Sequence, residues 1–138
     1  PHNFGAIIRS CEAFGVDAII IPNDRSVDIT GTVVKASVGT IEKVKIIKVT
    51  NLNNTIKKLK DYGYWVVGTD MEGTVYTDID YKMKTALIIG NEGKGISRLV
   101  SENCDYLAKI PMSGTVNSLN ASVACGIFLA EINRSRGV

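Results

Sequence analysis

The segment from residue 110 to residue 131 joins a short apolar strand, a polar turn that contains glycine, and a helix that is apolar on nearly every side. Asn117, Ser118 and Asn120 could cap the first turn of this helix, where backbone N–H groups lack partners within the helix. The same N–H groups and the positive end of the helix dipole favour a polar ligand in the turn. These polar residues therefore have two interpretations, simple capping or ligand binding. A helix that is apolar all round is expected to be buried.

A second candidate turn is the glycine-rich run at residues 90–95, which follows an apolar strand. Its spacing does not match a phosphate loop, because Ile96 and Ser97 stand where that loop requires Lys and then Ser or Thr. It does not match the dinucleotide fingerprint either, because the third glycine position of that motif would fall on Arg98. The run is therefore either a tight turn in which Glu92 caps the next helix, or a ligand-binding turn of another kind.

Arg9 is a third candidate for chemistry. It lies on a helix predicted over residues 3–15, with Asn3 near the N-terminus and Gly15 as the stop signal. An arginine among small residues can hold a phosphate or a carboxylate through two parallel hydrogen bonds. An ordinary surface arginine would show the same pattern, so Arg9 alone does not decide the function.

The elements that must position these residues alternate between helix and strand. Short apolar runs predict strands over residues 16–22, 44–50, 65–71, 85–90 and 106–112. Helical spacing predicts helices over residues 3–15 and 51–64, a short one within 90–104 and the C-terminal one, while residues 32–44 suggest a short helix broken at Gly39. This alternation implies an α/β fold, with a mostly parallel sheet and helices on both faces. Ligands bind beyond the carboxyl ends of such strands, which here are the loops after Ile89 and Ile110.

The composition limits the kind of protein. With 138 residues the chain is long enough for one domain with its own core. No apolar run approaches the roughly 20 residues that span a bilayer, so we expect no membrane segment. His2 and the three widely spaced cysteines offer neither metal-ligand spacing nor a disulfide framework, which predicts no metal site and a reducing, cytoplasmic environment. No serine or cysteine has a base partner that would make it a nucleophile.

Charge is distributed unevenly along the chain, although the net charge is only +2. Residues 31–60 hold seven lysines and a single acid, whereas residues 70–80 hold four acids and no base. A basic face of this kind could neutralise the phosphates of a nucleic acid. A solvated surface is the simpler interpretation, so the lysines only support a function argued on other grounds.

Three ordered motifs resemble those of the SpoU (TrmH-like) branch of the knotted SPOUT methyltransferases, which methylate ribose 2′-hydroxyls of RNA with S-adenosylmethionine. They are Asn3-x-Gly5 with Arg9, the turn Gly90-Asn91-Glu92-Gly93, and Ile110-Pro111-Met112 with Ser118-Leu119-Asn120. Residues 35–39, 50–52 and 62–68 further resemble the subgroup that acts on large-subunit (23S) ribosomal RNA. Three motifs in this order, in a match that covers nearly the whole chain, argue against chance similarity.

The resemblance implies a role for each motif residue. The cofactor would be contacted by Gly90, Ile110, Met112 and Leu119. The reacting centre would be shaped by Arg9, Glu92, Ser118 and Asn120, with Asn3 supporting Arg9. Because an arginine stays protonated in proteins, we expect Arg9 to orient the hydroxyl and bind the RNA phosphate rather than to act as the base.

The resemblance also implies a C-terminal trefoil knot, and a homodimer in which the arginine of one subunit lies near the cofactor of the other. We expect residues 1–138 to form a single catalytic domain without the family's first strand or an N-terminal RNA-binding domain. Ribosomal RNA is the first expectation for the substrate, and transfer RNA is the alternative. A catalytically silent RNA-binding module of the same fold is a different class. A third class is an α/β enzyme for another adenine-containing cofactor, and the two glycine fingerprints that do not match argue against it.

Overall fold

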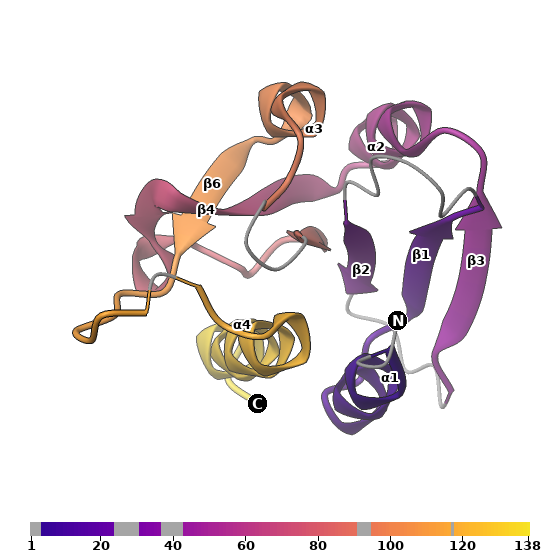
Figure 1. Cartoon of the computed structure of the whole chain (residues 1–138). Coiled ribbons are helices and arrows are strands. Elements are labelled where there is room, and N and C mark those ends of the chain that lie inside the picture. The colour runs from indigo at the N-terminus through magenta and orange to yellow at the C-terminus, as the bar shows by residue number, and fades with distance from the viewer. Residues whose placement is uncertain (1–3, 24–30, 37–42, 91–94, 117) are drawn as a thin grey trace.

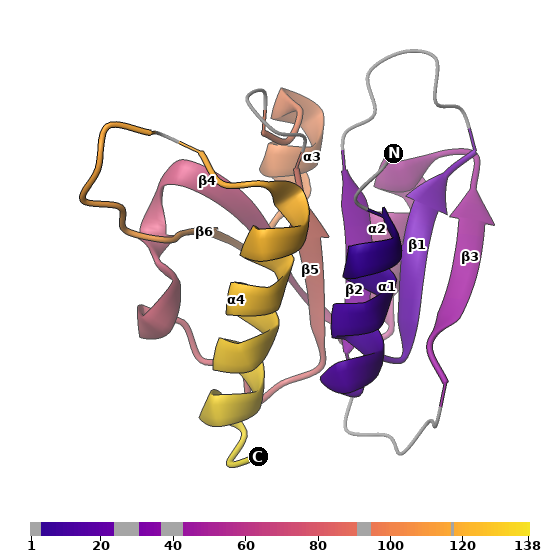
Figure 2. The ribbon, with the colours of Figure 1, turned by 60° about the horizontal axis from the view of Figure 1, so that its bottom comes forward.

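The structure, a computed structural model, describes residues 4–23, 31–36, 43–90, 95–116 and 118–138. These residues form one six-stranded sheet with helices on both faces (Figure 1). Helices α1 (Phe4–Ala13) and α4 (Ala121–Ser135) cover one face, and helices α2 (Leu52–Asp61) and α3 (Arg98–Asn103) cover the other (Figure 1, Figure 2). In this part of the chain no helix is long and apolar enough to cross a membrane.

The sheet has the strand order β3-β1-β2-β5-β4-β6. Its strands are β1 (Ala18–Pro22), β2 (Thr32–Ala36), β3 (Lys45–Val49), β4 (Trp65–Val75), β5 (Thr85–Ile89) and β6 (Tyr106–Lys109), and the short 3₁₀ helix η1 (Tyr76–Asp78) follows β4. The pairs β1·β3, β4·β5 and β4·β6 are parallel, whereas β2 is antiparallel to both of its neighbours. The expected α/β class, with a mostly parallel sheet and helices on both faces, is confirmed.

Strand β2 corrects one sequence prediction. A short helix was predicted over residues 32–44, but Thr32–Ala36 form a strand between β1 and β5, and residues 37–42 lie outside the described part. The reason lies in the β-branched residues Thr32, Val33 and Val34, which favour the pleated conformation. Val33 packs in the cluster beneath α2 and Val34 in the cluster beneath α4, and neither is exposed. Because successive side chains of a strand point to opposite faces of the sheet, β2 contributes to the apolar cluster on each face.

Strand β4 is longer than predicted and irregular. It continues to Val75, so part of the expected acidic loop is strand. Thr69 and Thr74 both stand opposite Ala108 of β6, which means that residues 70–73 are looped out of the ladder. Such bulges bend a strand and re-aim side chains, often beside functional sites. Here the bulge lies next to the ends of β5 and β6.

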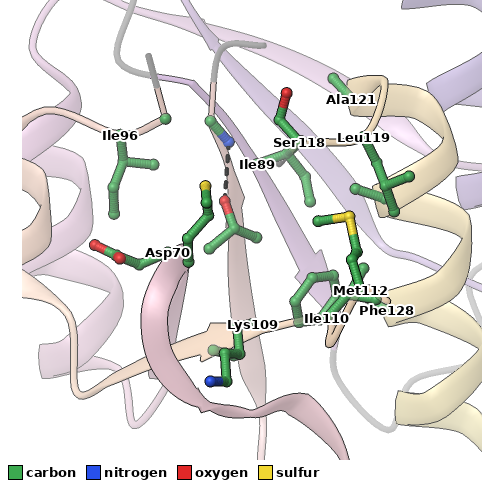
Figure 3. Close-up of a pocket in the computed structure, with 16 residues that line it drawn as sticks. Asp70, Ile89, Ile96, Lys109, Ile110, Met112, Ser118, Leu119, Ala121 and Phe128 are labelled. Atoms are coloured by element: carbon green, nitrogen blue, oxygen red, sulfur yellow. Dashed lines mark hydrogen bonds between the residues drawn. The ribbon is translucent and has the colours of Figure 1, made fainter. Parts of the chain in front are cut away.

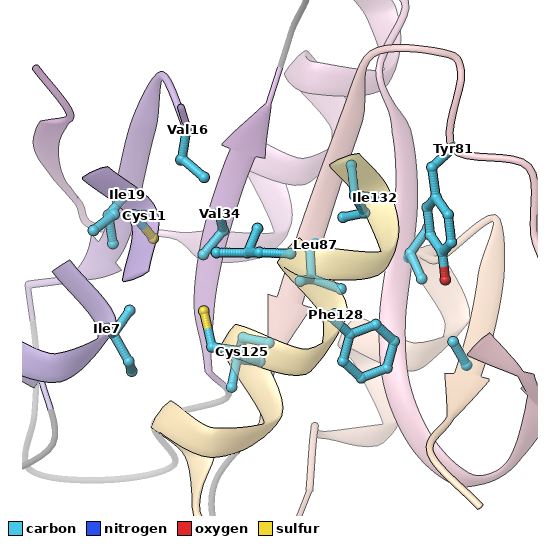
Figure 4. Packing of buried hydrophobic residues seen from close by; sticks show 14 of the residues in the cluster. Ile7, Cys11, Val16, Ile19, Val34, Tyr81, Leu87, Cys125, Phe128 and Ile132 are labelled. Atoms are coloured by element: carbon cyan, nitrogen blue, oxygen red, sulfur yellow. The ribbon is translucent and has the colours of Figure 1, made fainter. Parts of the chain in front are cut away.

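Two apolar clusters join the sheet to its helices. Beneath α1 and α4 the buried side chains include Ile7, Leu87 and Phe128, and this cluster also contains Cys11 and Cys125 (Figure 4). Beneath α2 and α3 the cluster includes Leu52, Ile56 and Val100. The predicted helix ends are confirmed on both faces: the Asn51 side chain caps α2, and Gly15 and Gly63 follow α1 and α2 with positive φ.

Helix α4 is buried on one side only, which corrects the expectation of complete burial. Phe128 and Leu129 are buried against the sheet, whereas Val123 is 50% exposed and Ala130 is exposed. The helix forms an outer layer, so its far side has no neighbour within the described part of the chain. An apolar side that stays open suggests a surface for another molecule.

The C-terminal end of α4 is held by Arg136. Its guanidinium donates hydrogen bonds to the carbonyl oxygens of Tyr81 (2.8 Å) and Met83 (2.6 Å) and to Thr85 Oγ1 (3.2 Å). These partners lie immediately before and at the start of β5. Because a charged donor forms stronger hydrogen bonds than a neutral one, Arg136 ties the last turn of the chain to the centre of the sheet.

We expect Arg136→Ala to lower the free energy of unfolding by about 2 kcal/mol, because several acceptors lose a charged donor. The matched control is Arg98→Ala, which removes an arginine whose side chain is 92% exposed in its pair with Glu102. Exposed pairs contribute little, so the control should change stability by less than about 0.5 kcal/mol. Urea denaturation measures both. Equal effects of the two substitutions would contradict the role given to Arg136.

Candidate functional site

A pocket of about 240 Å³ lies where β4, the ends of β5 and β6, and the N-terminus of α4 meet (Figure 3). Its lining is mainly apolar, with Ile89, Ile96, Ala108, Ile110, Met112, Leu119, Ala124 and Phe128. Polar side chains come from Thr69, Asp70, Lys109 and Ser118. The pocket occupies the position predicted from the sequence, beyond the carboxyl ends of parallel strands.

Gly90 brings bare backbone to the wall of the pocket. Its N–H donates a hydrogen bond to Thr69 Oγ1 at 3.2 Å, which joins the turn after β5 to strand β4 (dashed line in Figure 3). A Cβ atom at Gly90 would lie 2.6 Å from the carbonyl carbon of Gly95 and 2.8 Å from the backbone nitrogen of Ile96. Only glycine fits this close approach of two backbone segments, so the glycine-rich run is a packing requirement as well as a turn.

The N-terminus of α4 supplies another wall. Asn120 is the N-cap: its Oδ1 accepts hydrogen bonds from the backbone N–H of Ser122 (2.9 Å) and from Ser122 Oγ (2.6 Å). This cap fixes the direction in which the chain enters the helix. Ser118 and Leu119, directly before the cap, are half-buried and face the pocket. The predicted capping by Asn120 is confirmed, and a contact of its side chain with substrate stays a prediction.

The structure brings together five of the predicted site residues. Gly90, Ile110, Met112, Ser118 and Leu119 all line the pocket, although they come from two separate motifs. Their convergence follows from the sheet order, which places β5 and β6 on either side of β4.

The other predicted site residues are placed differently. Arg9 is exposed on α1 and is not among the pocket-lining residues. Asn3 and Glu92 lie outside the described part of the chain, as does Asn117. Within one chain, the described part of the first motif, including Arg9, therefore does not line the pocket.

Several lining residues were not predicted. Thr69, Asp70 and Met71 come from β4 and its bulge, and Lys109 comes from the end of β6. The loops predicted to bind a ligand were those after Ile89 and Ile110. The rule that ligands bind beyond strand ends applies equally to the end of the predicted strand at residues 65–71, and it could have pointed to these residues.

Charge and thiol chemistry in and around the pocket are sparse. Asp70 and Lys109 are its charged residues among those described, and none of the three cysteines lines it. Burial raises the pKa of the Cys104 thiol to about 12, and the hydrogen bond with Cys125 together with burial raises the pKa of Cys11 above its ordinary value. Neither thiol is ionised near neutral pH, so neither acts as a nucleophile. In the described ranges no cluster of His, Cys, Asp and Glu could hold a metal ion.

Comparisons with known proteins agree with this geometry. The family model described as the SpoU rRNA Methylase family matches residues 1–130. A TrmH family tRNA/rRNA methyltransferase of Staphylococcus saprophyticus is 53% identical over 137 residues, which is 99% of this chain and 55% of that protein. A protein of the same description from Staphylococcus aureus is 54% identical over 137 residues and is covered to 55%. The chain thus spans about half the length of these curated relatives.

Solved structures show the same fold. The crystal structure of the A. aeolicus TrmH/SpoU tRNA modifying enzyme superposes with a TM-score of 0.82 at 33% identity, over 99% of this chain and 70% of that one. The SpoU methyltransferase AviRb from Streptomyces viridochromogenes, solved in complex with the cofactor AdoMet, gives a TM-score of 0.76 at 30% identity, over 97% of this chain and 53% of that one.

We expect Gly90→Ala to lower the free energy of unfolding by about 2 kcal/mol, because the added Cβ would overlap backbone atoms that cannot rotate away. Gly114→Ala is the matched control, since a Cβ there meets nothing within 4 Å. Both substitutions restrict the unfolded chain to the same degree, so the difference between them isolates the clash. Chemical denaturation gives the free energy of unfolding of both variants. An unchanged value for Gly90→Ala would show that the backbone of the turn moves to accept the Cβ at little cost.

Proposed function

The chain belongs to the SpoU rRNA methylase family, and on that premise we propose that it transfers a methyl group from S-adenosylmethionine to a ribose 2′-hydroxyl of RNA. The observation that carries the proposal is the convergence of Gly90, Ile110, Met112, Ser118 and Leu119 on one pocket. These are the motif residues that the family resemblance assigns to the cofactor and the reacting centre. The AdoMet complex of AviRb supports the same cofactor.

The lining of the pocket fits this cofactor. Apolar side chains such as Ile110, Leu119 and Phe128 suit the flat adenine ring, and Gly90 adds backbone to the pocket wall. Asp70 and Ser118 offer hydrogen-bonding groups for the more polar parts. A mainly apolar cavity with a few polar groups is the usual form of a cofactor site.

The proposed reaction needs positioning more than covalent chemistry by the protein. Bound S-adenosylmethionine supplies a methyl group on a positively charged sulfur, and the ribose oxygen attacks that methyl in line, so that a C–O bond forms as the C–S bond breaks and the hydroxyl proton passes to a base or to water. Ser118, Asn120 and Glu92 would shape the reacting centre. Arg9 would bind the RNA phosphate and orient the hydroxyl, with Asn3 supporting it.

The proposal includes a homodimer. Arg9 is exposed and stands apart from the pocket lining, so a second subunit is the simplest way to bring an arginine to each pocket. Val116 and Val123, which are 66% and 50% exposed near the N-terminus of α4, give such a contact an apolar surface. The C-terminal knot and the assignment of residues 1–138 to a single catalytic domain belong to the same proposal, because both follow from the family.

For the substrate we propose ribosomal RNA of the large subunit (23S), with a cytoplasmic location. Four lysines are exposed and could contact phosphates: Lys45 and Lys48 on the edge strand β3, and Lys57 and Lys58 on α2. Transfer RNA is the alternative, supported by the description of the A. aeolicus relative. Mapping ribose methylation in cells with and without the gene distinguishes the two.

Calorimetric titration with S-adenosylmethionine is the first test. We expect saturable binding of one cofactor per chain, and its loss in Leu119→Asp, because a carboxylate would replace an apolar wall. If the wild-type chain does not bind S-adenosylmethionine, the proposed function is wrong. Binding of cofactor without methyl transfer to any cellular RNA would instead favour the catalytically silent RNA-binding module.

Arg9→Ala is expected to lower methyl transfer by about 100-fold while the dissociation constant of the cofactor stays unchanged, because the arginine acts on the RNA and not on the cofactor. Arg98→Ala, on the exposed face of α3, is the matched control and should retain both properties. Rates come from transfer of labelled methyl groups to RNA, and affinities from calorimetry. An equal loss of both in Arg9→Ala would show that its role was misassigned.

Subunit mixing tests whether Arg9 and the pocket act across a dimer. Arg9→Ala keeps an intact pocket, and Leu119→Asp keeps an intact arginine, so a mixed dimer regains one complete site. Statistical mixing then restores about a quarter of the wild-type rate, although each variant alone has about 1% of that rate or less. No recovery under conditions in which subunits exchange would contradict an arginine supplied by the second subunit.

Val123→Glu is expected to shift the chain towards monomer, because a buried unpaired carboxylate opposes association through α4. The fold should survive, since Val123 is 50% exposed. Leu99→Glu is the matched control, because Leu99 is 57% exposed but lies on α3, on the opposite face of the sheet. Light scattering after size-exclusion chromatography gives the masses, and a monomeric wild type would contradict the homodimer.

A further inference from the structure

We infer that the Asp70 carboxylate binds the ribose of the adenosine cofactor by accepting hydrogen bonds from its two vicinal hydroxyl groups. The inference rests on the proposed function, but it concerns a residue that lies outside all three motifs. It begins from the composition of the pocket, where Asp70 is the acid among the described lining residues. An acid in the wall of a mainly apolar cavity favours a hydrogen-bond donor or a cation in the ligand.

The bulge in β4 places Asp70 at the pocket. Residues 70–73 leave the ladder between Thr69 and Thr74, both of which stand opposite Ala108. In a regular strand, Asp70 would continue the pairing with β6. The bulge instead turns Asp70 and Met71 into the wall of the pocket, beside the turn at Gly90. An interrupted strand beside a ligand site is a recurrent way to aim a side chain.

A hydrogen bond holds the Asp70 side chain in place. Its Oδ1 accepts from the backbone N–H of Glu72 at 2.7 Å, a short contact that fixes the carboxylate plane. The side chain is half-buried. A carboxylate can accept about four hydrogen bonds, so it retains acceptor capacity for a ligand. Two neighbouring hydroxyls suit the two oxygens of a carboxylate, and an acid hydrogen-bonds the ribose 2′-hydroxyl of NAD in dinucleotide-binding folds.

Asp70 and the largest apolar side chains lie on different sides of the pocket. Figure 3 shows Asp70 on the side of Ile96, whereas Met112, Leu119 and Phe128 lie on the other side. Adenine fits the apolar side, which leaves the ribose towards Asp70 and Gly90. The cavity of about 240 Å³ is smaller than the roughly 300–1,000 Å³ of pockets that enclose a whole ligand, so it suits the nucleoside part of the cofactor. The amino-acid end would then extend outward.

A second assignment of Asp70 is possible on chemical grounds, since a carboxylate could also pair with the ammonium group at the amino-acid end. Lys109, the base among the described lining residues, could then hold the carboxylate of that end. The two assignments differ in which part of the ligand Asp70 touches. Ligands that lack one part or the other therefore separate them.

The test is Asp70→Asn, whose amide oxygen can still accept from Glu72 N–H, so the bulge is preserved. Asp80→Asn is the matched control, because Asp80 Oδ1 accepts from the backbone N–H of Lys82 at 2.9 Å in the same way but does not line the pocket. Dissociation constants are measured by calorimetry for S-adenosylhomocysteine and for methylthioadenosine, which keeps the adenosine but lacks the amino-acid end. Adenosine and dideoxyadenosine are compared by competition.

We expect Asp70→Asn to weaken both S-adenosylhomocysteine and methylthioadenosine by the same factor of about ten, the loss of one charge-assisted interaction. The preference of the wild-type chain for adenosine over dideoxyadenosine should disappear in this variant, and Asp80→Asn should change nothing. Weaker binding of S-adenosylhomocysteine alone would assign Asp70 to the ammonium and overturn the inference, as would unchanged affinity for both. If the wild-type chain binds no S-adenosylhomocysteine, the proposed function itself fails.

Discussion

The packing of α4 on the sheet decides where the pocket lies. Phe128, Leu129 and Ile132 are buried against the sheet, and this apolar contact fixes both the position and the direction of the helix. The N-terminus of α4 therefore comes to rest beside the ends of β5 and β6, where Ser118 and Leu119 enter the pocket wall. Phe128 itself lines the pocket, so the same side chain serves the core and the site.

Hydrogen bonds at the two ends of α4 fix its position along the apolar contact with the sheet. Asn120 caps the first turn, and Arg136 hydrogen-bonds carbonyl groups just before β5. Apolar contacts are non-directional, whereas hydrogen bonds have defined geometry. Burial of apolar side chains thus provides most of the free energy that holds α4 on the sheet. The hydrogen bonds at its two ends fix its position along the sheet. A pocket built from three separate segments needs that fixed position, because a shift of one residue would remove Leu119 from the wall.

Much of the fold follows from local sequence, and the exceptions have physical reasons. Buried runs such as Ala18–Pro22 and Thr85–Ile89 predict strands, and Gly15 and Gly63 mark the ends of α1 and α2. The strand at Thr32–Ala36 was missed because residues 32–44 were predicted as a short helix broken at Gly39, although the β-branched residues pointed the other way. The exposed side of α4 could not be foreseen, because an apolar helix does not reveal whether its far side is covered by the same chain or by another.

Site residues that belong to sequence motifs could be predicted, whereas the orientation of residues set by strand pairing could not. Gly90, Ile110 and Leu119 could be named from the sequence, and the structure unites them. For Asp70 the strand-end rule gives the region but not the direction of the side chain, since that direction depends on a bulge that exists only through pairing of β4 with β6. Arg9 presents the opposite case, because its motif is clear but its place on exposed α1 leaves it apart from the pocket. On the proposed dimer this separation has a functional consequence: cofactor affinity belongs to one chain, whereas transfer needs two. Activity would then depend on protein concentration in a range where cofactor binding does not.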